Sequence, residues 1–149
     1  MVHAEQEIRE SRLGEIASVR SGYQFRGPLR PDPAGTVRVI QIKDIADGHL
    51  AAQPDLIHVR LDRSPDPYLI QRNDVLFLSR GQRLSAIAID QPLNATITYS
   101  YFYIVRLHPR VDVIPQYLAW YINQPTAQAF LRSVHEGSNM PLPPPTRFW

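Results

Sequence analysis

Residues 68–89, around which the rest of the chain is organised, read YLIQRNDVLFLSRGQRLSAIAI. Within it, residues 75–80 alternate Val, Phe and Ser with Leu, Leu and Arg, and the β-branched and aromatic content favours an extended, largely buried strand. Asn73 and Asp74 stand in front of this strand as turn formers, and asparagine tolerates the left-handed conformation that a tight turn can demand. The stretch therefore predicts a strand, a tight turn, a strand, a polar loop and a third strand.

The polar loop of this stretch, residues 79–83, places two arginines and a glutamine around Gly81. Glycine lets the backbone approach a partner closely, and a buried strand that ends in such a loop has the form of a rigid scaffold with a recognition tip. The alternative is a solvated hairpin loop with ordinary surface arginines, since arginine is mostly exposed in proteins. The sequence leaves both interpretations open.

A second loop, nearer the N-terminus, combines the side chains that contact nucleic acids. Residues 13–18 predict a helical turn that leads into a short strand, and residues 21–28, SGYQFRGP, then break the regularity with two glycines and a proline. Aromatic, amide and arginine side chains can stack on bases and contact base edges. Alternatively, Tyr23 and Phe25 fold back onto the core, where aromatic side chains are often buried.

The remaining segments predict an α+β fold. Residues 36–42 and 56–61 have strand character, and residues 95–107 give the longest strand signal, with apolar side chains on both faces as in a central strand. Residues 115–123 and 125–135 show helical spacing of apolar side chains, and the first of them opens with a proline. We therefore expect a twisted, mostly antiparallel β-sheet core with a C-terminal helical hairpin packed on it.

Length and composition fit one globular domain, because the chain has 149 residues, 44% of them apolar and 20% charged. We expect a polar leader or frayed helix at residues 1–12, the domain at residues 13–141 and a flexible proline-rich tail at residues 142–149. The chain has no run of about 18 apolar residues that could span a membrane, and its first residues lack the apolar part of a secretory signal. These features predict a cytoplasmic protein without a membrane partner.

Arginine dominates the basic residues, since Lys43 is the single lysine among 16 basic side chains. Guanidiniums suit bidentate contacts with phosphate or guanine, although a GC-rich genome also favours arginine codons. From residue 20 to residue 43, five basic residues stand against the single Asp32, while the net charge of the whole chain is only +2. This distribution predicts one basic face and fits a nucleic-acid binder of modest affinity.

The residue patterns of common catalytic sites do not occur in the sequence. It has no cysteine, no glycine-rich nucleotide-binding loop and no nucleophile elbow, and its five histidines lack the spacing of metal ligands. We therefore expect a binding module rather than an enzyme, with no metal site and no cofactor of its own.

Four segments, taken in order, resemble parts of a known family. They read LGEIASVRSGYQF at residues 13–25, IQIKDIADGHL at 40–50, YLIQRNDVLFLSRG at 68–81 and PQYLAWYINQPTAQAFLRSVHEGSNMP at 115–141. Together they resemble a target recognition domain of the type I restriction–modification DNA specificity subunit. Such domains have an SRG-like loop after a Gly-Asp turn, here Asn73-Asp74, and a late helix that ends in Gly-Ser-x-Met. The family's next strand, helix pair and long spacer helix do not follow Met140, so we expect a C-terminally shortened half-subunit.

The resemblance implies sequence-specific reading of double-stranded DNA, without catalysis, in defence against phage. A full specificity subunit has two such domains, each of which reads one half of a split target, joined by long helices that dock methyltransferase subunits. S-adenosylmethionine would belong to the methyltransferase, which methylates adenine, and a restriction subunit would be a further partner. Half-length family members can pair, which makes a homodimer another expected arrangement.

On this hypothesis, arginines contact phosphates or guanine edges, and amide side chains address adenine. The predicted DNA-binding residues are Arg20, Tyr23, Gln24, Arg26, Arg30, Lys43, Arg80, Gln82, Arg83, Ser85, Ser138 and Asn139. A second hypothesis is a module that binds methyltransferase or specificity subunits without reading DNA, through Trp120, Phe148, Trp149 and the proline run. The alternative for these side chains is that Trp120 lies in the core and that the tail is disordered.

Overall fold

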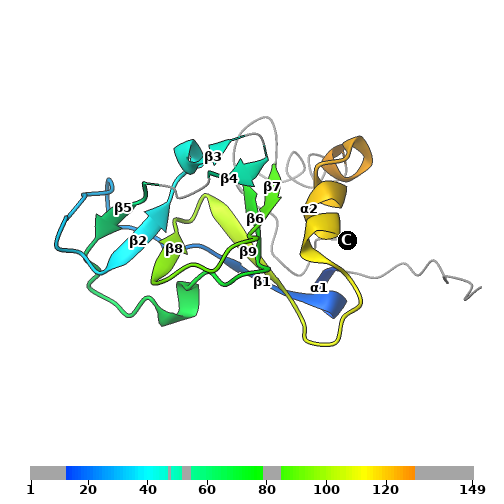
Figure 1. The fold of residues 1–149 in the computed structure, drawn as a ribbon, viewed down its shortest axis with the longest axis horizontal. Helices are drawn as coiled ribbons and strands as arrows, with labels where there is room; N and C mark the ends of the chain where they lie inside the picture. Colours follow the sequence, from blue (N-terminus) through cyan, green and yellow to red (C-terminus); the bar gives the residue numbers. More distant parts are fainter. Residues whose placement is uncertain (1–12, 47, 52–54, 79–84, 130–149) are drawn as a thin grey trace, which may run out of the picture.

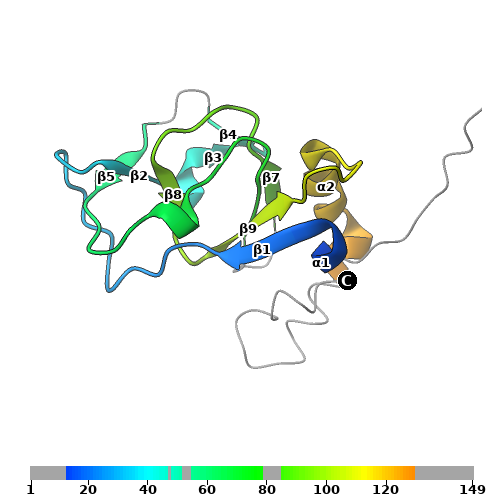
Figure 2. The same ribbon diagram turned by 90° about the horizontal axis from the view of Figure 1, so that it is seen from below.

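A computed structural model describes residues 13–46, 48–51, 55–78 and 85–129 of the chain. A helical layer, a four-stranded sheet and a three-stranded sheet follow one another along the long axis of the molecule (Figure 1), and the perpendicular view shows the same order (Figure 2). The elements of this part are α1 (Leu13–Ile16), β1 (Ala17–Ser21), β2 (Val37–Ile40), η1 (Ile42–Asp44), β3 (Ile45–Ala46), β4 (His49–Leu50), β5 (Ile57–Val59), η2 (Asp66–Tyr68), β6 (Val75–Leu78), β7 (Ala86–Ala88), β8 (Thr96–Thr98), β9 (Phe102–Leu107) and α2 (Pro115–Ile122).

The four-stranded sheet has the strand order β1-β9-β6-β7, and all its pairs are antiparallel. In β6, Val75 and Phe77 pack into the core beneath the helices, whereas Leu76 packs into the core on the opposite face of the sheet. The strand is buried on both faces, which explains its nearly continuous apolar sequence and confirms the prediction made from it.

The three-stranded sheet has the strand order β5-β2-β8, with β2 antiparallel to β5 and parallel to β8. After β2 the chain forms η1 and the short β3–β4 hairpin. All the other strand pairs in the described part of the chain are antiparallel, so the expected α+β class with a mostly antiparallel core is confirmed.

The prediction of a single long strand at residues 95–107 is wrong. A turn at residues 100–101, in which Phe102 N donates to Tyr99 O over 3.1 Å, divides the segment into β8 and β9, which belong to different sheets. Apolar side chains continue through the turn because the residues around it lie between two buried cores, so the alternation of side chains carries no sign of the break. The prediction of a central strand holds for β9, which lies between β1 and β6.

The strand predicted in front of the tight turn, from residue 68 onwards, is also wrong. Two prolines precede it, and the chain there forms η2 and then an irregular segment in which Ile70 N donates to Thr96 O over 2.9 Å. The tight turn itself is confirmed, because Asn73 has a φ of 75°, in the left-handed region that asparagine tolerates.

The helical layer covers the four-stranded sheet as predicted. Pro115 begins α2, and Leu118, Ala119 and Ile122 are buried against β6 and β7. At the end of α2, the carboxamide of Asn123 pairs with Ala86 as a neighbouring strand would, because it accepts from Ala86 N and donates to Ala86 O, both over 2.8 Å. The second predicted helix is observed over residues 125–129, and the rest of it lies outside the described residues.

Tyr103, at the centre of the sheet, predicts a pH dependence of stability. Burial raises the pKa of Tyr103 to about 12, whereas a tyrosine in an unfolded chain titrates near ~10. Between these values the unfolded chain binds fewer protons than the folded one, so the free energy of unfolding falls as the pH rises through this window. Urea unfolding at a series of alkaline pH values is expected to show a shallower fall for Tyr103→Phe than for the unsubstituted chain. Equal slopes would contradict this assignment.

Within the described ranges, no helix has the length and apolar character needed to cross a membrane.

Candidate nucleic-acid interface

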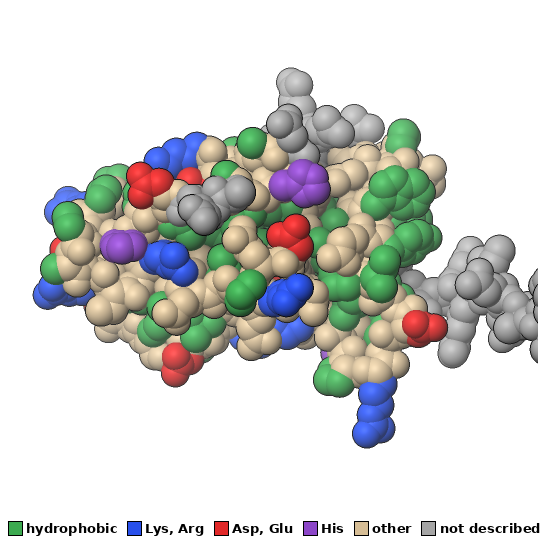
Figure 3. Space-filling view, viewed as in Figure 1, with side chains coloured by type: hydrophobic (Ala, Val, Ile, Leu, Met, Phe, Trp, Pro, Cys, Tyr) green, Lys and Arg blue, Asp and Glu red, His purple; other side chains and the backbone are tan. Residues whose placement is uncertain are grey.

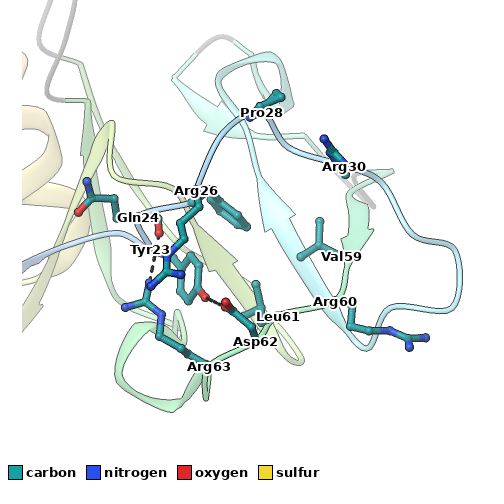
Figure 4. Close-up of a pocket in the computed structure, with 11 residues that line it drawn as sticks. Tyr23, Gln24, Arg26, Pro28, Arg30, Val59, Arg60, Leu61, Asp62 and Arg63 are labelled. Atoms are coloured by element: carbon teal, nitrogen blue, oxygen red, sulfur yellow. Dashed lines mark hydrogen bonds between the residues drawn. The ribbon is translucent and has the colours of Figure 1, made fainter.

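A hollow of about 250 Å³ lies at the end of the molecule that carries the three-stranded sheet (Figure 4). One side is formed by the loop after β1, and the other by the end of β5 and the residues that follow it. The lining residues are Tyr23, Gln24, Phe25, Arg26, Pro28, Arg30, Val59, Arg60, Leu61, Asp62 and Arg63. Four guanidiniums therefore surround the hollow with one carboxylate among them, and Figure 3 shows basic side chains gathered at this end of the molecule.

Gly22 and Tyr23 carry the chain from one sheet to the other and so fix the start of the first loop. Gly22 N donates to Phe102 O over 2.9 Å, and Tyr23 N donates to Thr98 O over 2.8 Å. A Cβ atom on Gly22 would lie 2.3 Å from the carbonyl oxygen of Tyr99, so only glycine fits at this crossing. The backbone geometry of the crossing thus sets the direction in which the loop leaves the core.

The rest of this loop is held beside the end of β5. Asp32 N donates to His58 O over 2.8 Å, and Gly35 N donates to Asp32 O over 2.8 Å. A Cβ atom on Gly35 would lie 2.3 Å from the carbonyl oxygen of Val59, so the two backbones touch directly there. Two segments that lie more than twenty residues apart in sequence are in this way brought to the same hollow.

Tyr23 forms the floor of the hollow. Its side chain is 2% exposed and packs against the rings of Phe25 and Tyr68, with centroids 4.7 and 5.2 Å away. The hydroxyl donates to Asp62 Oδ1 over 3.1 Å. The structure thus places Tyr23 in the core, as one of the two sequence interpretations has it, while its polar end reaches the hollow.

Arg63 is held above this floor in a defined orientation. Its Nη2 donates to the carbonyl oxygen of Gln24 over 3.2 Å, and its guanidinium carbon lies 4.9 Å from the centre of the Tyr23 ring. This is the geometry of a cation–π contact. Hydrogen bonding with the Tyr23 side chain raises the pKa of Arg63 above its ordinary value, so the guanidinium stays charged.

The other arginines of the hollow are less constrained. Arg60 Nε lies 3.4 Å from Asp32 Oδ2, and both side chains are largely exposed, so the ion pair adds little to stability. Among the described residues, Arg26 and Arg30 have no hydrogen-bond or ion-pair partner. The hollow therefore combines one oriented cation with three exposed ones.

Two of the predicted DNA-binding residues lie away from the hollow. Arg20 is exposed on β1, and its Nη1 donates to the carbonyl oxygen of Pro67, which ties β1 to η2. Lys43 belongs to η1, which follows the Ile40 end of β2, whereas the hollow lies at the opposite, Val37 end of that strand.

Ser85 lies just before β7, where its carbonyl oxygen accepts from Leu78 N over 2.8 Å. The strand register places Leu78 and Ser85 at the same end of the four-stranded sheet as Ser21, because Phe77 pairs with Tyr103, which pairs with Ser21. Five further predicted residues, Arg80, Gln82, Arg83, Ser138 and Asn139, lie outside the described residues.

Sequence reasoning missed Arg60 and Arg63, which supply half of the guanidiniums of the hollow. Arg60 lies in the strand predicted at residues 56–61 and Arg63 follows it, within the stretch HVRLDRSPDP, and this arginine-rich strand end was the available signal. Their relevance depends on the pairing of β5 with β2, which places the end of β5 beside the loop after β1. Among the described residues, no three histidine or acidic side chains gather closely enough to hold a metal ion.

The fold has a counterpart among solved structures. It is similar to part of the HsdS subunit from Thermoanaerobacter tengcongensis, with a TM-score of 0.53 and 16% sequence identity, over 81% of this chain and 29% of that chain. HsdS is a type I restriction–modification specificity subunit. The fold implied by the sequence resemblance is thereby confirmed, and this chain spans less than a third of the length of that subunit. No family model matches the sequence, and no curated protein matches it significantly.

Proposed function

We propose that this chain is a non-catalytic DNA-recognition module of a type I restriction–modification system. It binds double-stranded DNA in a sequence-specific manner, reads one half of a split target and directs a methyltransferase and restriction complex to it. The observation that carries the proposal is the hollow with four guanidiniums around Tyr23, at one end of a fold shared with part of HsdS. S-adenosylmethionine belongs, on this proposal, to the methyltransferase partner.

The chemistry of the loop after β1 suits both parts of such recognition. Its exposed cations supply the sequence-independent attraction to phosphates that dominates affinity for DNA. Gln24 is exposed beside them, and a glutamine can pair with the N6 and N7 atoms of adenine through two hydrogen bonds. Rigid sheets hold the start of the loop, so the exposed side chains are presented with little loss of backbone entropy on binding.

A titration against a mixed-sequence duplex at several salt concentrations tests the proposal. We expect log K to fall with log salt with a slope of about −0.9 for each phosphate engaged. The double variant Arg26→Gln/Arg30→Gln is expected to bind the duplex at least about tenfold more weakly, because it loses two side chains whose contacts with phosphates or bases contribute to affinity. Arg72→Gln is the matched control, since Arg72 is an exposed arginine near the Val75 end of β6, away from the Leu78 end. A flat salt dependence would remove the proposal.

One observation favours a second candidate function, the binding of a methyltransferase subunit. Ile114, Tyr117 and Trp120, at and along α2, are 64%, 54% and 56% exposed, so Trp120 does not lie in the core. The Tyr117 ring lies 5.8 Å from that of Trp120, and residues 113–131 contain no charged side chain. A surface of aromatic side chains without cations suits a protein partner rather than DNA (Figure 3).

The double variant Tyr117→Ser/Trp120→Ser tests this second candidate. Both side chains are more than half exposed, so the fold should remain intact, and co-purification with the methyltransferase subunit in the absence of DNA should be lost. Gln116→Ser is the matched control, because Gln116 is exposed on the same helix as Tyr117 and Trp120. Retained co-purification of the double variant would exclude this surface as the docking site.

A further inference from the structure

We infer that the hollow between residues 23–30 and residues 59–63 is a phosphate-binding subsite, which takes one phosphodiester group of a nucleic-acid backbone. This inference rests on the proposed function for the source of the phosphate. It also assigns separate roles within the site, with the arginines as phosphate anchors and Gln24 as the residue that remains for base recognition.

The size of the hollow fits a small anion. Its volume of about 250 Å³ is below the ~300–1,000 Å³ typical of pockets for organic ligands, so the hollow suits a single small chemical group, such as a phosphate, rather than a whole cofactor or nucleotide. This volume is also several times the ~30 Å³ that a water molecule occupies in the liquid, so a phosphate group and bound water molecules have room in the hollow.

The charge of the lining also selects an anion. Four arginines line the hollow, and one of them, Arg60, is paired with Asp32. The Asp62 carboxylate of the lining already accepts from the Tyr23 hydroxyl. Like charges around one hollow repel one another, and a bound anion relieves that repulsion. A guanine edge is neutral and would relieve it far less, which favours phosphate over a base as the occupant.

The orientation of the side chains supports the same division of roles. Arg63 is fixed by the Gln24 carbonyl oxygen and by the Tyr23 ring, which leaves the remaining donors of its planar fork for a ligand. A preorganised fork loses little rotamer entropy when it binds a phosphate in a bidentate manner. Figure 4 shows the Gln24 carboxamide directed away from Arg30 and Arg60, where it can reach a base beside the anchored phosphate.

The test begins with inorganic phosphate added to the full, isotopically labelled chain while chloride holds the ionic strength constant. We expect saturable shifts of the Arg63 Nε–H signal and of the backbone amides of residues 23–27 in the nuclear magnetic resonance spectrum. Arg63→Gln should weaken the apparent phosphate affinity about tenfold, as expected for the loss of a charge-assisted hydrogen bond. Arg63→Lys keeps the charge without the fork and should fall between the two, whereas Arg72→Gln should match the unsubstituted chain.

A duplex titration forms the second arm. Arg63→Gln should lower the magnitude of the salt slope by about 1 and weaken all duplex sequences alike, as the loss of a phosphate contact does. If the unsubstituted chain binds duplex but Arg63→Gln changes neither the slope nor the phosphate response, the subsite is wrong and the proposed function stands. If phosphate binds in the hollow and no duplex binds, the subsite stands and the proposed function fails. Arg63 is exposed, so the thermal unfolding midpoint should confirm that each variant is folded.

Discussion

Asp74→Ala is expected to lower the free energy of unfolding by about 3 kcal/mol, the low end of the cost of leaving one member of a buried ion pair alone. The Asp74 side chain is 1% exposed and accepts from Arg106 Nε and Nη2 over 2.8 and 2.9 Å and from Gln71 N over 2.8 Å. Hydrogen bonding to Asp74 raises the pKa of Arg106. A guanidinium is always protonated in proteins, so Arg106 remains a cation without its partner after the substitution. The lower end of the range applies because the Arg106 side chain is 36% exposed and water can reach it.

Urea unfolding followed by circular dichroism measures this loss. Asp90→Ala is the matched control, because Asp90 is an exposed aspartate in the segment that follows β7, and its substitution should change stability by no more than about 0.5 kcal/mol. Asp74→Asn should fall between the two, since the amide keeps one acceptor oxygen and loses the charge. Equal midpoints for Asp74→Ala and Asp90→Ala would show that the ion pair does not hold the tight turn to β9.

Gly22→Ala is expected to have an effect of similar size, about 3 kcal/mol, at the upper end of the usual cost of overpacking. The added Cβ atom would meet the Tyr99 and Thr98 carbonyl oxygens at 2.3 and 2.7 Å, and backbone atoms cannot move aside as a flexible side chain can. Because Gly22 marks the crossing between the sheets, the strain should also displace Tyr23 and weaken DNA binding.

Gly14→Ala is the control for this substitution. Gly14 lies in α1, a Cβ atom there would meet no atom within 4 Å, and alanine has the higher helix propensity. We expect Gly14→Ala to be neutral or slightly stabilising in thermal unfolding and to leave duplex binding unchanged. A Gly22→Ala chain as stable as Gly14→Ala would mean that the two sheets are not joined as described.

Local chemistry made the central part of the fold predictable from sequence. Asn73, the alternation in β6 and the proline at the start of α2 each act through contacts within a few residues, and each prediction from them is confirmed. The break at residues 100–101 was not predictable in this way, because apolar side chains on both sides of it serve two different cores. Its position depends on tertiary pairing, in which β8 joins β2 and β9 joins β1 and β6.

In the candidate site, too, some residues were predictable from local sequence and others depend on strand pairing. Gln24, Arg26 and Arg30 follow one another in a loop whose composition pointed to nucleic-acid contact, and the structure places them along one hollow. Arg60 and Arg63 reach that hollow only because β5 pairs with β2. A single sequence carries no direct sign of that pairing, so half of the cationic side chains of the site became visible only with the fold.

Selection from a library of random double-stranded oligonucleotides would show whether this chain recognises a DNA sequence. The full chain would be immobilised at moderate salt, and the retained duplexes would be sequenced over successive rounds. We expect enrichment of a short motif, half of a split target, and we expect Gln24→Ala to retain duplexes with a relaxed preference at one position of that motif. Retention without any enriched motif, or no retention at all, would contradict sequence-specific recognition by this chain.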